Sequence, residues 1–313
     1  MIKEEFYFDS RDGENRIHAV RYTPDDGNVR GIVQIVHGMA EYVERYEELA
    51  KYLTKRGILV TGEDHLGHGK SVSEGGSFGY FCEQDPATVV VRDVHRLKKI
   101  TEEQYPQVPY IILGHSMGSF IARNYLCRYG SGIGGAVIVG TGMQPAGLIF
   151  ASKAMAGIQK LFCGSKHVSH FIDKAAFGGY NKRIDSPRTS SDWLSRNTEN
   201  VDRYIEDELC GFTFTVNGFQ TLFELIRRLQ KQENLEKVPQ NLPILMVSGA
   251  EDPVGDYGKG VHKACDSLKR AGVKNITVKL YENDRHELLN EDDAEVAMED
   301  IWQWICKEIP GIA

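Results

Sequence analysis

The chain has 313 residues, of which 41% are hydrophobic and 26% charged, and its 44 acidic and 37 basic residues give a formal net charge of −7. This length and composition are typical of a globular protein with a sizeable core. The basic residues are scattered and form no block that tracks a phosphate backbone, which argues against a nucleic-acid partner.

The N-terminal part begins with a predicted hairpin and continues as an alternation of strands and helices. Stretches 5–8 and 16–22 have strand character and are separated by the turn Asp12-Gly13-Glu14-Asn15, so we expect them to pair antiparallel. The apolar runs that follow predict strands at 31–36, 58–60, 111–113, 135–139, 243–248 and 276–281, with helices at 42–56 and 87–104. This alternation predicts an α/β fold with a mostly parallel sheet and helices on both faces.

A stretch of about a hundred residues, 141–240, shows helical spacing and no clear strand. It is far longer than the usual connection of ~4–6 residues. Helical patterns cover 146–162, 201–209 and 220–232. We therefore expect 141–240 to be an inserted helical cap over the C-terminal edge of the sheet, where open α/β folds bind ligands. Residues 1–140 and 241–313 then form the core domain.

The pentapeptide Gly114-His115-Ser116-Met117-Gly118 lies between the apolar run 110–113 and the helical segment 119–126. A serine on a tight strand-to-helix turn projects its hydroxyl from the sheet edge, and the strained backbone leaves no space for side chains two residues before or after it. This context predicts that Ser116 is a catalytic nucleophile.

A serine nucleophile needs a base to take its proton and a carboxylate to orient that base. In this architecture the acid and the histidine follow the serine, each in a loop after a strand. Asp252 follows the strand ending near Ser248, and His286 follows the strand ending near Tyr281. We assign Asp252 as the orienting acid, with Glu251 and Asp256 as local alternatives, and His286 as the general base.

Acyl transfer also needs hydrogen-bond donors for the oxyanion. The usual pair is the amide after the nucleophile and one amide from the loop after the third strand. These amides belong to Met117 and to Met39, which follows His37-Gly38.

The segment 64–71, Asp-His-Leu-Gly-His-Gly-Lys-Ser, contains two patterns that invite other interpretations. Its Gly-Lys-Ser ending lacks the earlier glycine of a phosphate loop. His65 and His68 lie on a glycine-rich turn rather than on a fixed helical face, so a metal site is not predicted. A serine triad supplies its own nucleophile and proton shuttle, and we expect no cofactor.

Six widely spaced cysteines without a C-x-x-C pair indicate reduced thiols rather than a disulfide framework or a structural zinc site. No signal peptide is readable at the N-terminus, and the longest apolar tract, 133–162, is interrupted by glycine, proline and lysine. We expect a cytoplasmic protein with no integral membrane segment. The sequence gives no indication of the oligomeric state.

Three motifs give the chain a resemblance to the α/β-hydrolase superfamily. They are His37-Gly38-Met39-Ala40-Glu41 followed by Arg45-Tyr46, the segment 64–71, and the pentapeptide around Ser116. Together they resemble the monoacylglycerol lipase and lysophospholipase group, which is also described as serine aminopeptidase S33-like. Tyr42 departs from the histidine that many monoacylglycerol lipases carry there, and the cap matches no characterised lipase lid.

The resemblance and the candidate triad together imply a serine carboxylester hydrolase that acts on lipid-like or small acyl esters through an acyl-enzyme. The substrate-binding candidates are aromatic residues of the cap, namely Phe150, Phe212, Phe214 and Phe219, with Phe162 and Phe223 as further possibilities. One alternative is a serine peptidase that holds a free amine with Glu206, Asp207 and Glu208. Others are an acyltransferase and, in a different class, a ligand sensor without turnover.

Overall fold

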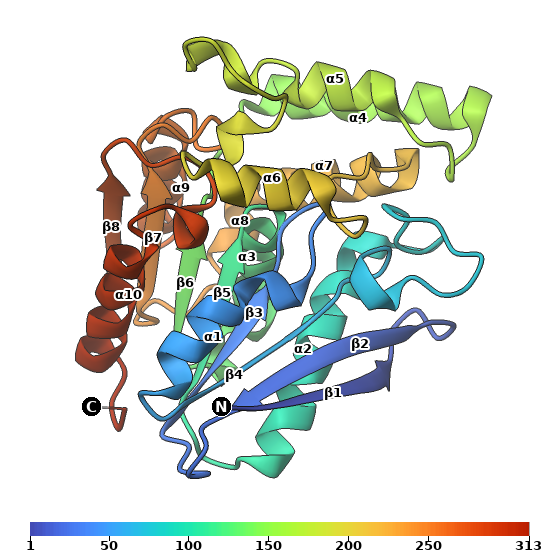
Figure 1. Cartoon of the computed structure of the whole chain (residues 1–313). Helices are drawn as coiled ribbons and strands as arrows, with labels where there is room; N and C mark the ends of the chain where they lie inside the picture. Colours follow the sequence, from blue (N-terminus) through green and yellow to red (C-terminus); the bar gives the residue numbers. More distant parts are fainter. Residues whose placement is uncertain (313) are drawn as a thin grey trace.

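Eight strands form one sheet in the computed structural model, which describes residues 1–312 (Figure 1). The strands are β1 (Ile2–Asp9), β2 (Arg16–Thr23), β3 (Gly31–Val36), β4 (Ile58–Glu63), β5 (Tyr110–His115), β6 (Gly135–Val139), β7 (Ile244–Gly249) and β8 (Ile276–Tyr281). Their spatial order is β1-β2-β4-β3-β5-β6-β7-β8. The β1/β2 and β2/β4 pairs are antiparallel and all other neighbours are parallel, which confirms the predicted α/β fold and its N-terminal hairpin.

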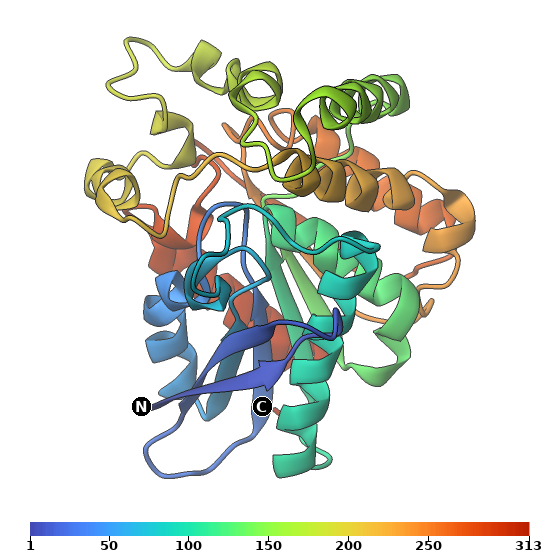
Figure 2. The same ribbon diagram turned by 90° about the vertical axis from the view of Figure 1, so that its right-hand side faces the viewer.

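Helices cover both faces of the sheet because the central strands are apolar on both sides. In β3, Ile32 belongs to the core under one set of helices and Val33 to the core under the other. One face is covered by α2 (Pro86–Gln104), α3 (Met117–Tyr129) and α9 (Lys259–Arg270), and the other by α1 (Glu47–Thr54) and α10 (Ala294–Glu308). Figure 2 shows α2 and α3 on one side of the sheet and α1 on the other. The predicted helix at 42–56 is observed as the short 3-10 helix η1 (Val43–Tyr46) followed by α1.

Between β6 and β7 the chain is helical, as the pattern predicts. The helices are α4 (Ala146–Cys163), α5 (His170–Phe177), α6 (Thr198–Glu206), α7 (Val216–Leu229) and α8 (Gln232–Leu235). The remaining 3-10 helices are η2 (Gly69–Ser71), η3 (Gly130–Gly132), η4 (Tyr180–Arg183), η5 (Asp192–Leu194) and η6 (Leu288–Asn290). Helices α4, α5 and α6 lie beyond the C-terminal ends of the parallel strands (Figures 1 and 2). Helix α7 packs against α3 and α2 and supports α4 from below.

Across residues 1–312, no helix combines the length and the apolar character that a membrane span requires. The second predicted core segment, 241–313, is described up to residue 312.

A buried carboxyl at the end of β4 makes the stability of the fold depend on pH. Glu63 is fully buried and accepts a hydrogen bond of 3.2 Å from Gln34 Nε2. Burial raises the pKa of Glu63 from 4.5 to about 8. Because this pKa is higher in the folded chain than in the unfolded chain, the folded state binds the extra proton and loses stability as the pH rises through this interval.

We expect Glu63→Gln to reduce this loss by about 1.4 kcal/mol per pH unit between these two pKa values, because an amide does not ionise. Urea unfolding at a series of pH values measures the slope. The exposed Glu103→Gln on α2 is the matched control and is expected to keep the parent slope. Equal slopes for Glu63→Gln and the parent chain would show that Glu63 does not titrate in this interval.

Candidate active site

Ser116 is the junction between β5 and α3, and its backbone is strained. Its φ of 56° and ψ of −122° lie in a region that residues other than glycine rarely adopt. Its amide donates to Val139 O at 3.0 Å, which holds the turn against the end of β6. This is the predicted strand-to-helix elbow, with the serine at its apex.

The glycines that flank the elbow are required by close backbone contacts. A Cβ built on Gly118 would lie 1.9 Å from Val36 O, and one built on Gly114 would lie 2.4 Å from Gly118 O. Neither position has space for a side chain, as the sequence pattern predicts.

Asp252 and His286 are brought together by the loops after β7 and β8. His286 Nδ1 lies 3.0 Å from Asp252 Oδ2. Asp252 is fully buried and also accepts from Ser248 Oγ at 3.2 Å and from Val254 N at 2.8 Å. These bonds fix the carboxylate and leave Nδ1 as the nitrogen of His286 that donates to it.

The other nitrogen of His286, Nε2, is buried and has no hydrogen-bond partner among residues 1–312. The imidazole lies beside the elbow, because its backbone oxygen is 3.1 Å from His115 Nε2 and its ring centroid is 4.7 Å from that of His115. On another side it packs against Trp193 of η5, with ring centroids 5.1 Å apart. A buried imidazole with one nitrogen held by a carboxylate and the other unpartnered is suited to exchanging a proton.

The loop with the candidate oxyanion donors lies against the elbow. A Cβ built on Gly38 would lie 3.1 Å from Ser116 Cβ, so Met39 follows directly after a residue in contact with the serine. Met117 is the first residue of α3, and amides in the first turn of a helix have no partner within the helix. Gly38 N donates to Glu41 Oε1 at 2.6 Å, which fixes this loop.

A buried network of charges connects the loop of Gly38 with the loop of His286. Arg45 donates to Glu41 Oε2 at 2.8 Å and to both oxygens of Glu287 at 2.6 and 2.8 Å. Asn200 of α6 donates to Glu287 Oε2 at 2.6 Å, so the network also includes the helices above the sheet. His115 completes it, with Nδ1 3.3 Å from Glu41 Oε1.

The pKa values within this network favour the charged forms despite burial. Burial alone would raise the pKa of Glu41. The hydrogen bond from His115 and the charge of Arg45 together lower the pKa by more than burial raises it, so the net shift is downward. Burial likewise opposes the ionisation of Glu287, and the charge of Arg45 again brings its pKa below the usual value. Burial lowers the pKa of His115, but the hydrogen bond to Glu41 and the charges of Glu41 and Glu287 together raise it above its usual value.

Glu41, Arg45 and His115 lie in motifs found in the sequence, but the network that they form with Glu287 and Asn200 was not predicted. The position of Trp193 beside His286 was also missed. Two features of the sequence could have indicated the charge network: the short spacing between Glu41 and Arg45, and the acidic residue directly after His286.

Three of the four predicted aromatic residues lie together, and the fourth does not. The ring centroids of Phe214 are 6.1 Å from Phe212 and 5.8 Å from Phe219. His68 packs against both Phe212 and Phe214, with centroids 5.3 Å away in each case. Phe150, on α4, is instead 78% exposed to solvent.

The histidines of the early turns bond to the backbone. His37 Nε2 accepts from His65 N at 3.0 Å, and His68 Nδ1 lies 3.0 Å from Leu66 O. Burial lowers the pKa of His68 to about 3, so this imidazole is neutral.

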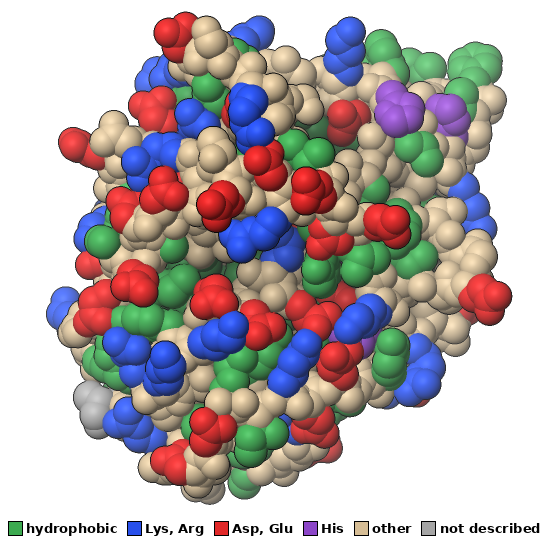
Figure 3. Space-filling view, in the orientation of Figure 1, with side chains coloured by type: hydrophobic (Ala, Val, Ile, Leu, Met, Phe, Trp, Pro, Cys, Tyr) green, Lys and Arg blue, Asp and Glu red, His purple; other side chains and the backbone are tan. Residues whose placement is uncertain are grey.

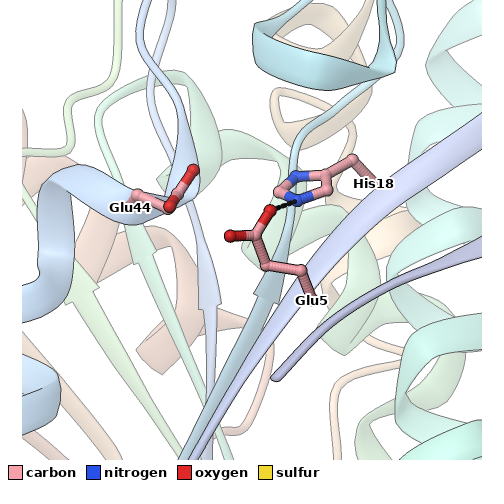
Figure 4. Close-up of side chains that lie close together, drawn as sticks. All are labelled: Glu5, His18 and Glu44. Carbon is pink, nitrogen blue, oxygen red and sulfur yellow. Dashed lines mark hydrogen bonds and ion pairs between the residues drawn. The ribbon is translucent and has the colours of Figure 1, made fainter. Parts of the chain in front are cut away.

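Glu5, His18 and Glu44 are the one group of potential metal ligands within residues 1–312 (Figure 4). His18 Nε2 lies 3.0 Å from Glu5 Oε2. Lys70 Nζ lies 2.7 Å from Glu5 and 3.0 Å from Glu44, and Lys3 also pairs with Glu44. The ammonium groups already neutralise these carboxylates, so the group is an ion-pair cluster that joins β1 and β2 to η1.

The sheet with helices on both faces, the strained serine between β5 and α3 and the buried Asp–His pair define a serine hydrolase of the α/β-hydrolase class. The chain belongs to the serine aminopeptidase S33 family, whose model matches residues 27–293. This confirms the family that the three motifs indicate.

Relatives with known names support the same class. The monoglyceride lipase of Rattus norvegicus is 29% identical over 273 residues, which are 87% of this chain and 80% of the relative. The monoacylglycerol lipase of Mycolicibacterium smegmatis is 27% identical over 289 residues, which are 92% of each chain. A carboxyl esterase from Bacillus coagulans, solved in complex with glycerol, is 31% identical with a TM-score of 0.92 over the whole of both chains.

Proposed function

We propose that this enzyme hydrolyses monoacylglycerols and related carboxylic esters of lipid-like acids. The observation that carries the proposal is the buried Asp252–His286 pair beside the strained Ser116, with the Nε2 atom of His286 unpartnered. The names of the relatives indicate the substrate class, because two are monoacylglycerol lipases and a third is an esterase with bound glycerol.

In the proposed reaction, Ser116 Oγ attacks the ester carbonyl while His286 Nε2 takes the hydroxyl proton. Asp252 holds Nδ1 and stabilises the imidazolium that forms. The amides of Met39 and Met117 donate to the oxyanion of the tetrahedral intermediate. His286 then protonates the leaving alcohol, and water resolves the acyl-enzyme by the same proton transfers in reverse.

Residues 141–240 act in this proposal as the cap that shapes the acyl pocket, with 1–140 and 241–313 as the core. Gly211 N donates to Ala40 O at 3.0 Å, which joins the segment before Phe212 to the candidate oxyanion loop. Phe212 is partly exposed and would line the pocket next to the scissile ester, with the fully buried Phe214 and Phe219 packed behind it.

The proposed peptidase alternative receives less support from the acidic residues of the cap. Asp207 accepts from Tyr42 OH at 2.8 Å and from Leu209 N at 2.9 Å, so it is already engaged. Glu206 and Glu208 are exposed to solvent. These carboxylates form no enclosed site for a substrate amine.

A cytoplasmic location is proposed on the cysteines alone. All six are free, as is usual in a reducing compartment.

Hydrolysis of a substrate panel tests the proposed function. The panel comprises monoacylglycerols and p-nitrophenyl esters of increasing chain length, with aminoacyl p-nitroanilides for the peptidase alternative. We expect kcat/KM for the best ester to exceed that for any anilide by at least about a hundredfold, because the proposed pocket offers apolar walls and no partner for a charged amine. A preference for the anilides would replace the ester proposal with the peptidase.

A further inference from the structure

Trp193 covers the imidazole of His286 from the helical segment above the sheet. Its ring centroid lies 5.1 Å from that of His286, and the two ring planes are tilted by 41°. At this separation the two rings are in direct contact. The ring of Tyr180 meets Trp193 edge-on, with centroids 4.8 Å apart. The indole is therefore held between a side chain of η4 and the candidate base.

The backbone that carries this indole is bonded to both sequence neighbours of the imidazole. Arg285 Nη1 donates to Asp192 O at 2.7 Å and to Ser195 O at 3.0 Å. Glu287 N donates to Leu194 O at 2.6 Å. Bonds on either side of the imidazole thus fix its distance from the indole.

The other sides of His286 are occupied by residues of the core. Asp252 Oδ2 lies 3.0 Å from Nδ1, and the ring centroid of His115 is 4.7 Å from that of His286. A Cβ built on Gly140 would lie 3.1 Å from Cε1. These contacts leave Nε2 and the adjoining indole of Trp193 as the side that a substrate can approach.

The chemistry of the proposed reaction places the leaving alcohol on this side. His286 Nε2 protonates the alcohol oxygen, so that oxygen comes within about 3 Å of Nε2. The carbon atoms next to this oxygen then lie against Trp193. The acyl group leaves the carbonyl carbon in another direction, toward Phe212, whose neighbour Gly211 is bonded to Ala40 of the candidate oxyanion loop. The two halves of the ester therefore meet different aromatic residues.

The charges around this segment are mixed, and several of them are paired. Helix α6 contacts η5, and Figure 3 shows basic and acidic side chains intermingled on this face of the molecule. Arg196 pairs with Asp284 and Asp293, and Arg188 pairs with Asp202 of α6. Neither sign of charge prevails, so shape is left as the basis for selecting an alcohol.

We propose that Trp193 limits the size of the leaving alcohol. Glycerol, which a monoacylglycerol releases, is compact enough to lie beside the fixed indole. An acylglycerol, which a diacylglycerol releases, carries a second chain close to the ester oxygen and collides with the ring. This inference rests on the proposed function, because it requires an acyl-enzyme on Ser116, and it assigns the alcohol preference of that enzyme to one residue.

Competition between water and an added alcohol for the acyl-enzyme tests this assignment. p-Nitrophenyl butyrate acylates Ser116 and releases p-nitrophenol. His286 then takes the hydroxyl proton of the added alcohol, the alcohol oxygen bonds to the acyl carbon, the bond from that carbon to Ser116 Oγ breaks, and the proton passes to Oγ. Chromatography measures the ratio of butyrate ester to butyric acid. Every alcohol meets the same acyl-enzyme, so this ratio reports the leaving-alcohol side alone.

The two alcohols are glycerol and 2-O-benzylglycerol, which keeps both primary hydroxyls and adds a bulky ether on the carbon between them. We expect the parent chain to favour glycerol. Trp193→Ala is expected to raise the yield of 2-O-benzylglycerol ester relative to glycerol ester by at least about tenfold, and Trp193→Phe by less. Trp302→Ala, which removes a partly exposed tryptophan of α10, is the matched control and keeps the parental ratio.

An unchanged alcohol ratio in Trp193→Ala would overturn the proposal, as would an equal shift in Trp302→Ala. If Trp193→Ala does not fold, Trp193→Phe decides, and the parental ratio in that variant would overturn the proposal. Phe212→Ala is expected to change the preference between butyrate and octanoate esters and to leave the alcohol ratio unchanged. A parent chain that forms no acyl-enzyme with any ester would contradict the proposed function, whereas ester hydrolysis with an alcohol ratio independent of residue 193 contradicts this inference alone.

Discussion

Ser116→Ala is expected to lower kcat for ester hydrolysis by at least about 10⁴-fold, because removal of the nucleophile prevents formation of the acyl-enzyme. The free energy of unfolding is expected to stay close to that of the parent chain. The substitution removes only Oγ and leaves the backbone bond from residue 116 to Val139 O in place. Steady-state kinetics on a p-nitrophenyl ester and urea unfolding measure the two quantities.

The matched control for this variant is Ser131→Ala, which changes an exposed serine in η3 and is expected to retain parental activity. Near-parental turnover in Ser116→Ala would assign the nucleophile to another residue. A large loss of stability in Ser116→Ala would make its kinetics uninformative about chemistry, and the substitution Ser116→Cys would then be used to preserve the volume of the side chain.

Arg45→Met is expected to destabilise the fold by about 3–5 kcal/mol, because it leaves the buried carboxylates of Glu41 and Glu287 without their cation. It is also expected to lower kcat more than it raises KM. Glu41 holds the candidate oxyanion loop through Gly38 N, and Glu287 directly follows the candidate base. Chemical unfolding and steady-state kinetics on one soluble ester measure both effects.

Two further variants separate the loss of the ion pairs from the loss of the arginine side chain. Adding Glu41→Gln and Glu287→Gln to Arg45→Met removes the unpaired charges, and this triple variant is expected to recover part of the stability. Arg92→Met, at an exposed position of α2, is expected to cost little. An Arg45→Met chain as stable and active as Arg92→Met would show that the network does not position the loops.

The positions of Ser116, Asp252 and His286 were predictable because each depends on local order along the chain. A strand, a tight turn and a helix define the elbow, and the other two residues each follow a strand of a parallel sheet. Parallel strands end at the same edge, so the sequence order alone brings these loops together.

The buried network was not predictable because its contacts join residues far apart in the chain. Arg45 and Glu287 are 242 positions apart, and no local pattern marks them as partners. The contact of Trp193 with His286 likewise depends on how the helices above the sheet fold back on the β8 loop.

Phe150 shows a different limit of sequence patterns. Helical periodicity groups it with other apolar residues of α4, but the same stripe results whether a helix faces the core or the solvent. The buried Ile149 and Ala156 on the opposite side decide the orientation, and they direct Phe150 outward.

The most direct test of the central claim is to trap the acyl-enzyme. A p-nitrophenyl ester is mixed with the chain, the reaction is quenched in acid within the first turnover, and intact and peptide masses are measured. We expect the mass of one acyl group on the peptide that contains Ser116, and no added mass in Ser116→Ala. Acylation of a different residue, or equal acylation of Ser116→Ala, would contradict the assignment of Ser116 as the nucleophile.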